Sequence, residues 1–221
     1  MEEFSYSVSH DLRGPLRAMN MYAEALLEDY ASQLDDTGKG YLERIRRSSV
    51  RMEKLTQDVL TYSRVARTQV ELARIDVERL IGDVVNQYVE LQRPQADVEI
   101  DEPLYPVIGH EASLGQCLSN LLSNAAKFVP AGTRPRIRVR TERQGARVRI
   151  WVEDNGIGIK PQYQDKLFHV FERLPTGGHY EGTGIGLAIV RKATEKMGGS
   201  CGVYSDGEHG SRFWLELAAA D

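Results

Sequence analysis

The sequence predicts a chain in two parts. The first is an all-α helical hairpin that pairs into a dimeric four-helix bundle, and the second is an α+β sandwich with a mixed sheet and helices on one face. Apolar residues recur every three or four positions in the first part, as they do in long packed helices. From about residue 74 the pattern changes to short strands alternating with amphipathic helices. Two glycine-rich segments interrupt this second part.

Two long helices are expected at residues 4–34 and 40–70. The repeating positions are Leu12, Leu16, Met19, Ala23, Leu26 and Tyr30 in the first, and Ser48, Met52, Leu55, Val59, Tyr62 and Ala66 in the second. Between them, Asp35-Asp36-Thr37-Gly38 supplies residues typical of a reversal. Because one hairpin cannot bury both apolar stripes, we expect a homodimer. We assign residues 1–72 to the hairpin and residues 73–221 to the second part.

The second part reads as a mixed sheet with three helices. Strands are expected at 74–76, 98–100, 105–108, 136–142, 147–153, 202–205 and 212–217. Helices are expected at 77–92, 113–128 and 185–197, and the last of these is stopped by Gly198-Gly199.

The composition is that of an ordinary folded protein. Of 221 residues, 41% are hydrophobic and 27% are charged, which argues against a disordered chain. Lys plus Arg total 28 and Asp plus Glu total 32, and this net charge of −4 argues against a nucleic-acid-binding domain. No apolar run approaches the ~18 residues of a membrane-spanning helix, so we expect a cytoplasmic location and no membrane segment. Cys117 and Cys201 lack metal-binding spacing and are expected to be free, buried thiols.

Arginines crowd the predicted hairpin of strands at 136–153, and a nucleic-acid patch is one interpretation of them. They alternate with apolar residues, so a period of two sends the apolar set inward and the arginines to solvent. Nearby Glu142, Glu153 and Asp154 dilute the positive charge. We therefore expect a solvated sheet face and no nucleic-acid partner.

The segment Asp154-Asn155-Gly156-Ile157-Gly158-Ile159 directly follows a buried strand. A carboxylate at a strand end can accept a hydrogen bond from the amino group of a base, and the glycines let the backbone approach a flat ring. An ordinary Asp-Asn-Gly turn is the alternative.

A second glycine segment, Gly182-Thr183-Gly184-Ile185-Gly186-Leu187, opens a helix. Glycine-rich backbone at a helix N-terminus presents N–H groups and the positive end of the helix dipole to an anion such as a phosphate. The segment is not a dinucleotide fingerprint, because no parallel β-α-β unit surrounds it. Nor is it a Walker loop, because no Gly-Lys-Ser/Thr follows.

Asn120, Asn124 and Lys127 share one face of the helix expected at 113–128. Amide oxygens on that face can hold a hard cation, and the lysine can meet a phosphate. The alternative is the polar outer face of an amphipathic helix.

Together these motifs resemble the transmitter module of sensor histidine kinases in two-component systems. The similarity runs through five boxes in family order and covers essentially the whole chain. These are the H box at Ser9 to Leu16, the N box at Asn120 to Phe128, the first glycine box at Asp154 to Ile159, the F box at Phe168 to Phe171 and the second glycine box at Gly182 to Leu187. Asp11, directly after the histidine, is similar to the phytochrome-like branch rather than to the Glu-bearing majority.

The resemblance implies an ATP-dependent kinase that phosphorylates its own His10, assisted by Asp11, and passes the phosphoryl group to an aspartate of a response regulator. The implied cofactors are ATP and Mg²⁺, with the metal on Asn120, Asn124 or both and the adenine amino group on Asp154. The other implied nucleotide-site residues are Lys127, Gly156, Gly158, Phe168, Phe171, Arg173, Gly182, Thr183, Gly184, Gly186 and Leu187. The implied partners are a second copy of the chain, a receiver domain, and an upstream sensor domain that we expect to be missing from this chain.

His10 lies two residues before Leu12, about 200° around the helix, so we expect it to face solvent. Pro15 removes a helical N–H and should bend the helix beside it. Gly14 stands where relatives that dephosphorylate their receiver often carry Thr or Asn. We therefore expect weak or absent phosphatase activity.

Lys160 to Glu181 would form a lid over the nucleotide, with Pro175-Thr176-Gly177-Gly178 mobile until nucleotide binds. Phe168 and Phe171 are expected to anchor the lid by hydrophobic contact, and Arg173 to reach a phosphate. His179 and Tyr180 are assigned no role.

Two alternatives come from other functional classes. A non-relay ATPase of the same superfamily, as in DNA gyrase or heat-shock chaperones, would hydrolyse ATP without a phosphohistidine, and the H-box hairpin argues against it. A catalytically dead dimerisation scaffold would be expected to carry eroded glycine boxes, and both are intact.

Overall fold

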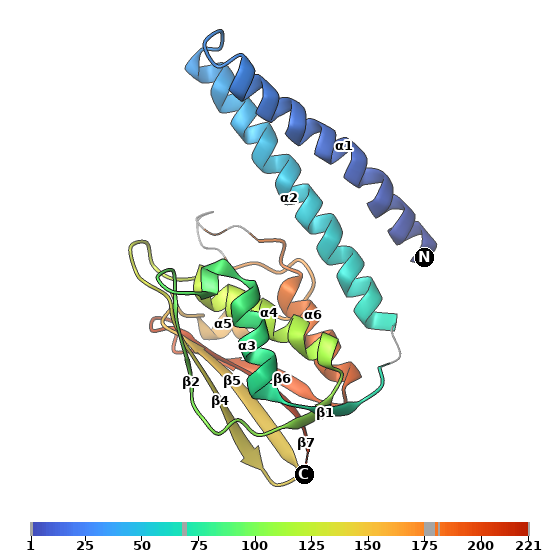
Figure 1. The fold of residues 1–221 in the computed structure, drawn as a ribbon, viewed down its shortest axis with the longest axis vertical. Coiled ribbons are helices and arrows are strands. Elements are labelled where there is room, and N and C mark those ends of the chain that lie inside the picture. Colours follow the sequence, from blue (N-terminus) through green and yellow to red (C-terminus); the bar gives the residue numbers. More distant parts are fainter. Residues whose placement is uncertain (1, 68–69, 175–179, 181, 221) are drawn as a thin grey trace. The chain divides into compact units, whose positions relative to one another are not determined.

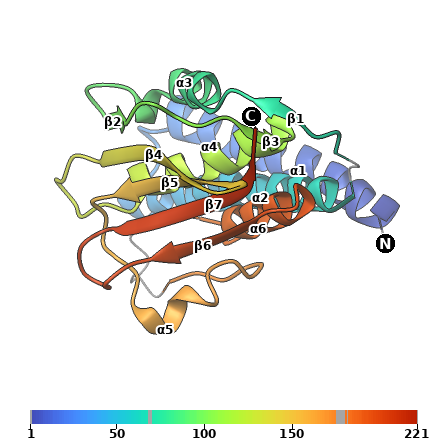
Figure 2. The same ribbon diagram turned by 90° about the horizontal axis from the view of Figure 1, so that it is seen from below.

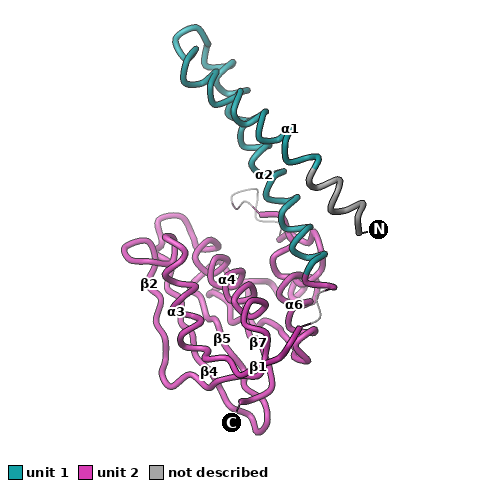
Figure 3. The backbone as a smooth tube through the Cα atoms, turned by 45° about the vertical axis from the view of Figure 1, so that its right-hand side comes forward, with its two compact units in different colours: residues 1–64 teal, residues 65–221 magenta. Residues whose placement is uncertain are grey.

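The computed structural model describes residues 2–67, 70–174, 180 and 182–220, with the backbone alone for residues 2–10. The chain divides into two compact units at the step from Arg64 to Val65 (Figure 1, Figure 3). The first unit is a helical hairpin, and the second is a sheet with helices on one face. Among the described residues, no helix combines the length and the apolar character needed to cross a membrane.

The hairpin consists of α1 (Glu2–Asp29) and α2 (Asp36–Arg67). Two contacts between the helices show that they run antiparallel. Arg13 Nη2 donates to Gln57 Oε1 at 2.9 Å, and Arg17 Nε donates to Glu53 Oε1 at 3.0 Å. α1 continues through Pro15, so the proline expected to bend this helix does not interrupt it.

The reversal between the two helices lies earlier than predicted. Residues 30–34 make the turn, whereas Asp36, Thr37 and Gly38 already belong to α2. Asp35 Oδ1 accepts a hydrogen bond from the backbone N–H of Gly38 at 2.7 Å, which satisfies a donor that the first helical turn leaves unpaired. The four residues predicted as a turn therefore form the capped start of a helix.

Only part of the predicted apolar stripe is buried within one chain. Leu16 and Ala23 are buried on α1, while the buried residues of α2 are Ser49 and Leu60, each one position beyond the predicted stripe. The stripe of α2 is predicted for a four-helix bundle, and within one chain its Leu55, Val59, Tyr62 and Ala66 are half-buried. Exposed fractions of 40–52% remain at Leu12, Met19, Leu26, Tyr30 and Met52.

The second unit is built on a seven-stranded mixed sheet in the order β1-β3-β7-β5-β4-β2, with β6 pairing β7. Its strands are β1 (Ala73–Ile75), β2 (Asp97–Ile100), β3 (Val107–Gly109), β4 (Arg136–Gln144), β5 (Arg147–Asp154), β6 (Ser200–Tyr204) and β7 (Ser211–Ala219). The β2–β4 pair is parallel and the other pairs are antiparallel. Each predicted strand is confirmed to within a few residues.

Three helices cover one face of this sheet: α3 (Val77–Gln87), α4 (Glu111–Lys127) and α6 (Gly186–Lys196) (Figure 1, Figure 2). A short α5 (Pro161–Gln164) lies in the segment between β5 and α6. Alternate strand residues and the inner faces of the helices form one hydrophobic core. Its members include Ile81, Leu118, Leu121, Leu122, Ile137, Val139, Val148, Ile150, Val152, Val190, Leu215 and Leu217.

The first helix of the second unit is shorter than predicted. α3 is capped by Asp76 and ends at Gln87 rather than at residue 92. Tyr88 is extended, and a separate 3-10 turn follows as η1 (Val89–Leu91), whose last residue is buried. Ser119 of α4 donates to the Tyr88 hydroxyl at 2.7 Å. The apolar spacing alone predicts that the helix continues to residue 92. It ends earlier because Tyr88 and Leu91 make these tertiary contacts instead.

The opposite face of the sheet carries the arginines, and the predicted alternation along β4 and β5 is confirmed. Arg140 pairs with Glu153 at 2.8 Å, and Arg149 pairs with Glu216 at 2.7 Å. The guanidinium group of Arg140 also lies 4.9 Å from the ring centre of Trp151, and that of Arg149 lies 4.3 Å from the ring centre of Trp214. Arg140 and Arg149 are therefore each paired with a carboxylate on this face of the sheet.

Both cysteines are free thiols, as predicted. Cys117 is fully buried, whereas Cys201 is only half-buried. Burial raises the pKa of each thiol to about 12, which keeps both in the unreactive protonated form at neutral pH.

Candidate active site

α4 presents the polar face predicted from its sequence. Its apolar residues are buried in the core, so Asn120 and Asn124 are half-buried and Lys127 is exposed on the other side. The Asn120 side-chain N–H donates to the carbonyl of Gln116 at 2.9 Å, which fixes the orientation of the amide. Asn120 Oδ1 then faces the start of α6, because a Cβ added to Gly186 would lie 2.8 Å from this oxygen.

Asp154 is the last residue of β5 and anchors the first glycine segment. Its Oδ1 accepts hydrogen bonds from the backbone N–H groups of Gly156 at 2.8 Å and Ser211 at 3.1 Å. Because both donors hold the same oxygen, Oδ2 is the oxygen that could accept from a ligand. Burial raises the pKa of this carboxyl to about 6, and the two backbone N–H groups act against the shift.

The glycines after Asp154 are required by close packing. A Cβ on Gly156 would collide with the carbonyl oxygen of Phe128, the C-cap residue that follows α4. The N–H of Ile157 donates to that same carbonyl at 2.9 Å. Gly158 has a φ of +71°, and a Cβ there would meet the backbone of the β6–β7 loop. The first glycine segment is therefore fastened to the C-terminal end of α4.

The second glycine segment also lies beside α4, next to Lys127 and Asn120. A Cβ on Gly182 would lie 3.3 Å from Lys127 Nζ. Gly184 has a φ of +74°, and its carbonyl accepts the N–H of Phe171 at 2.9 Å. α6 begins at Gly186, one residue later than predicted, so its N-terminus opens beside Asn120. Thr183 is half-buried, and Leu187 packs against the core.

Three separate motifs therefore meet around the C-terminal half of α4. Together they offer a carboxylate at a strand end, amide oxygens, a lysine and the N–H groups at the start of a helix. Such a helix start attracts anions, and lysine adds positive charge. This combination can bind a ligand that carries both a base with an amino group and a phosphate chain.

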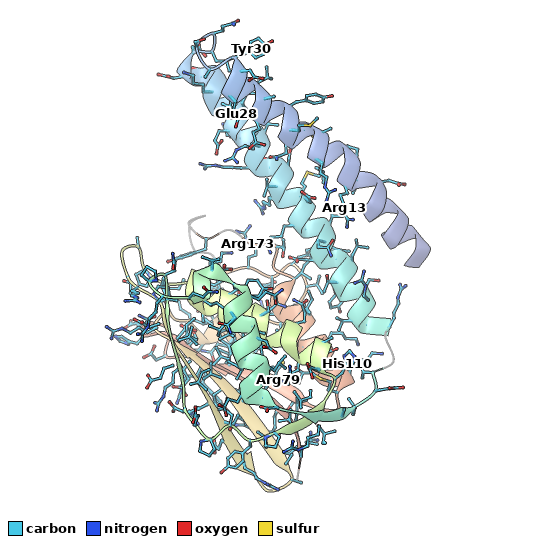
Figure 4. All side chains as sticks on the ribbon, viewed as in Figure 1. Arg13, Glu28, Tyr30, Arg79, His110 and Arg173 are labelled. Atoms are coloured by element: carbon cyan, nitrogen blue, oxygen red, sulfur yellow. The ribbon has the colours of Figure 1, made fainter. Side chains whose placement is uncertain are left out.

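The F-box region differs from its prediction at one residue. Phe168 is half-buried and packs against the core, as an anchor would. Phe171 instead has 60% of its surface exposed and a φ of +67°, and its ring is not among the described residues packed against the core. Its backbone does the holding, through the bond from its N–H to Gly184. Arg173, labelled in Figure 4, is exposed and donates to the carbonyl of Tyr180 at 3.0 Å.

Tyr180 is the residue that sequence reasoning missed. Its hydroxyl donates to the carbonyl of Val129 at 2.8 Å, and its ring centre lies 5.3 Å from that of Phe128. No periodicity or motif in the sequence signals this contact, because the partners are 51 residues apart in the hydrogen bond. The residues predicted to be mobile, Pro175-Thr176-Gly177-Gly178, lie outside the described residues, as do His179 and Glu181.

The H box lies in the other unit. The backbone of His10 belongs to α1, while its side chain lies outside the described residues. Asp11 and Gly14 are exposed on the same helix. A Cβ on Gly14 would meet nothing within 4 Å.

Both units match family models. Residues 1–68 match the His Kinase A (phospho-acceptor) domain. Residues 109–221 match the histidine kinase-, DNA gyrase B-, and HSP90-like ATPase, just over half of the chain. The chain belongs to the sensor histidine kinases. The resemblance inferred from the five boxes is thereby confirmed.

Named histidine kinases and phytochromes align with nearly the whole chain. Phytochrome-like protein Cph1 of Synechocystis sp. is 32% identical over 98% of this chain. The sensor-like histidine kinase SenX3 of Mycolicibacterium smegmatis is 33% identical over 97% of it. The chain spans 29% of the length of Cph1 and 56% of that of SenX3, so each relative contains more than this module.

Solved histidine kinase structures share the fold. Full-length ShkA, in a crystal structure with AMPPNP, is 31% identical, covers 100% of this chain with 47% of its own, and gives a TM-score of 0.70. The mycobacterial sensor histidine kinase MprB is 28% identical, with a TM-score of 0.58 over 67% of this chain and 98% of its own. The predicted fold class, a helical hairpin followed by an α+β ATPase domain, is confirmed.

Proposed function

We propose that the chain is the kinase module of a two-component system, which binds ATP, phosphorylates its own His10 and passes the phosphoryl group to an aspartate of a response regulator. Residues 1–72 would form the dimerisation and phosphotransfer part, and residues 73–221 the catalytic ATP-binding part. The observation that carries the proposal is the meeting of three separate motifs around α4, in a chain that also has a phospho-acceptor hairpin. The AMPPNP complex of ShkA supports an adenine nucleotide as the ligand.

Different residues would bind different parts of the nucleotide. Asp154 would accept a hydrogen bond from the adenine amino group, while the backbone of Gly156 and Gly158 lets the ring come close. The N–H groups of Gly182 to Gly186 and the dipole of α6 would face the phosphates. Lys127, beside Gly182, adds positive charge to the phosphate side.

Magnesium fits the oxygen atoms that α4 supplies. The orientation of the Asn120 amide leaves Oδ1 directed at the start of α6, and neutral amide oxygens are ligands that Mg²⁺ accepts. Among the described residues, no group of three or more His, Cys, Asp and Glu could hold a metal by itself. The phosphates would therefore complete the set begun by Asn120, Asn124 or both. Bound Mg²⁺ would neutralise phosphate charge during transfer.

In the proposed reaction a neutral ring nitrogen of His10 attacks the γ-phosphorus in line. An N–P bond forms and the bond to the bridging oxygen of ADP breaks. Asp11 orients the imidazole and stabilises the proton on its other nitrogen. The product is a phosphoramidate that an aspartate of a receiver domain can attack in turn.

A homodimer is the proposed assembly of the hairpin. The apolar residues that one chain leaves exposed on α1 and α2 form the surface that a second hairpin would cover. The match to the phospho-acceptor family supports the same assembly.

The test is incubation of the chain with γ-labelled ATP and Mg²⁺. We expect label that is labile in acid and stable in alkali on the parent, none on His10→Gln, and none when a chelator removes the metal. His209→Gln is the matched control, since His209 is an exposed histidine outside the proposed machinery and should leave labelling unchanged. ATP hydrolysis without protein label would instead identify a non-relay ATPase. Label on His10→Gln would remove the proposal.

A further inference from the structure

We infer that Tyr180 is a positioning residue of the nucleotide site, which holds the C-terminal end of α4 in the shape that binds nucleotide. This inference rests on the proposed ATP site. Tyr180 acts through Phe128 and Val129 rather than by reacting itself. Its hydroxyl group and its ring make separate contributions, so they can be tested separately.

The described part of the chain gives Tyr180 three contacts. The hydroxyl donates to the carbonyl of Val129 at 2.8 Å, just beyond the end of α4. The ring packs against Phe128 with 5.3 Å between ring centres and 44° between planes, a tilted aromatic pair. The backbone carbonyl accepts the guanidinium N–H of Arg173 at 3.0 Å. Tyr180, which received no role from its sequence position, is therefore held by contacts of both its side chain and its backbone.

Phe128 joins the two sides of the site. Its carbonyl accepts the N–H of Ile157 and blocks any side chain at Gly156, so it is fixed against the segment that carries Asp154. Lys127 Nζ lies 5.1 Å from the centre of the Phe128 ring, within the range of a cation–π contact. A shift of Phe128 would consequently disturb both the base side and the phosphate side.

The hydrogen bond and the ring contact of Tyr180 hold the end of α4 in one arrangement, so they pre-organise this junction. Removing one of them leaves the end of α4 with more conformations, and binding must then order it. The loss of one neutral hydrogen bond corresponds to roughly a 3- to 10-fold change in a dissociation constant. Because the described interactions of Tyr180 are with Val129, Phe128 and Arg173, the effect should fall on binding and not on the transfer step.

The experiment compares the parent with Tyr180→Phe, which keeps the ring and removes the hydroxyl, and with Tyr180→Ala, which removes both. Tyr105→Phe is the matched control, because Tyr105 lies between β2 and β3, outside the site, with 38% of its surface exposed. Calorimetry measures the Kd of ADP and of ATP with Mg²⁺. Labelling of His10 measures KM for ATP and kcat, and thermal unfolding without nucleotide checks the fold.

We expect Tyr180→Phe to raise the Kd of ADP and of ATP by the same factor, roughly 3- to 10-fold, and KM with it, while kcat changes less than twofold. Tyr180→Ala should raise Kd and KM by a larger factor than Tyr180→Phe does, and Tyr105→Phe should leave both at the values of the parent. The inference is overturned if Tyr180→Phe binds nucleotide as tightly as the parent or more tightly, or if kcat falls at constant KM. Failure of the parent to bind any adenine nucleotide would overturn the proposed function as well, so the two failures are distinguishable.

Discussion

Asp154 shows how one carboxyl group can serve both the fold and a ligand. One oxygen is committed to the backbone N–H groups of Gly156 and Ser211, and burial raises the pKa of the group to about 6. Ionisation of this residue near neutral pH therefore lowers the free energy of unfolding of the chain. A ligand that donates a hydrogen bond to the carboxylate would recover part of that cost.

Replacing Asp154 by Asn should change the pH dependence of stability in a defined direction. The pKa is raised from an ordinary 3.8 to about 6, so the stability that Asp154 contributes is complete below about pH 4 and is lost as the pH rises through about 6. Asn keeps the accepting oxygen and cannot ionise. Chemical denaturation without nucleotide should show Asp154→Asn gaining about 1–3 kcal/mol over the parent between pH 4.5 and pH 8. Its affinity for ATP should fall at least ~10-fold.

A suitable control for this pH experiment is Asp206→Asn. Backbone N–H groups of Glu208 and His209 lower the pKa of Asp206 to about 2, so its contribution is present above about pH 4 and is lost on acidification. The control should not gain on the parent with rising pH. Identical pH profiles for the parent and Asp154→Asn would contradict the assignment.

Gly186→Ala tests the placement of Asn120 at the start of α6. The new methyl group would lie 2.8 Å from Asn120 Oδ1 and displace the amide, so we expect ATP affinity with Mg²⁺ to fall roughly 10-fold in a folded protein. Gly82→Ala is the control, because a Cβ there meets nothing within 4 Å in α3. The control should raise stability by up to about 1 kcal/mol and leave affinity unchanged. Equal affinities for both variants would refute the placement.

Most of the site could be predicted at the level of single residues, because its motifs are short stretches with fixed backbone demands. Gly156, Gly158 and Gly184 lie where a side chain would clash. Phe171 and Tyr180 could not be assigned in this way. The first was expected to use its ring and uses its backbone, and the second depends on a tertiary partner that no local pattern reveals.

At the scale of elements, apolar spacing predicted that α1 and α2 exist but not which faces meet within the hairpin. A helix in a four-helix bundle packs against two neighbours, so its apolar surface covers two adjacent faces. The predicted stripe of α2 leaves out Ser49 and Leu60, which are the described residues of this helix that one chain buries. Element ends depended on tertiary contacts in the same way, as Tyr88 and Ser119 show for α3.

Gly14→Thr tests whether α1 lacks a residue needed to dephosphorylate a receiver. The position has open space around it, so Thr should fit without disturbing the helix. We expect the parent to dephosphorylate a phosphorylated receiver weakly or not at all, and the variant to do so several-fold faster. The measurement is the loss of label from the receiver in the presence of ADP. A variant no faster than the parent would remove this explanation.

At the scale of the whole molecule, the exposed apolar residues of the hairpin predict that the chain associates. Met52→Glu places a charge on the surface proposed for the dimer, so the Kd of dimerisation should rise roughly 100-fold or more. Lys54→Glu is the control, since Lys54 is an exposed polar position on the same helix. Sedimentation over a range of concentrations measures both. A parent that stays monomeric would contradict the proposed assembly.

The proposed function depends most on the transfer of a phosphoryl group from bound ATP to the imidazole of His10. Tandem mass spectrometry of tryptic peptide 1–13, kept at alkaline pH after incubation with ATP and Mg²⁺, tests this directly. We predict one phosphoryl group on His10 in the parent and a smaller phosphorylated fraction in Asp154→Asn at the same subsaturating concentration of ATP. Phosphate on a serine or tyrosine of that peptide, or no modification in a parent that binds ATP, would contradict the account.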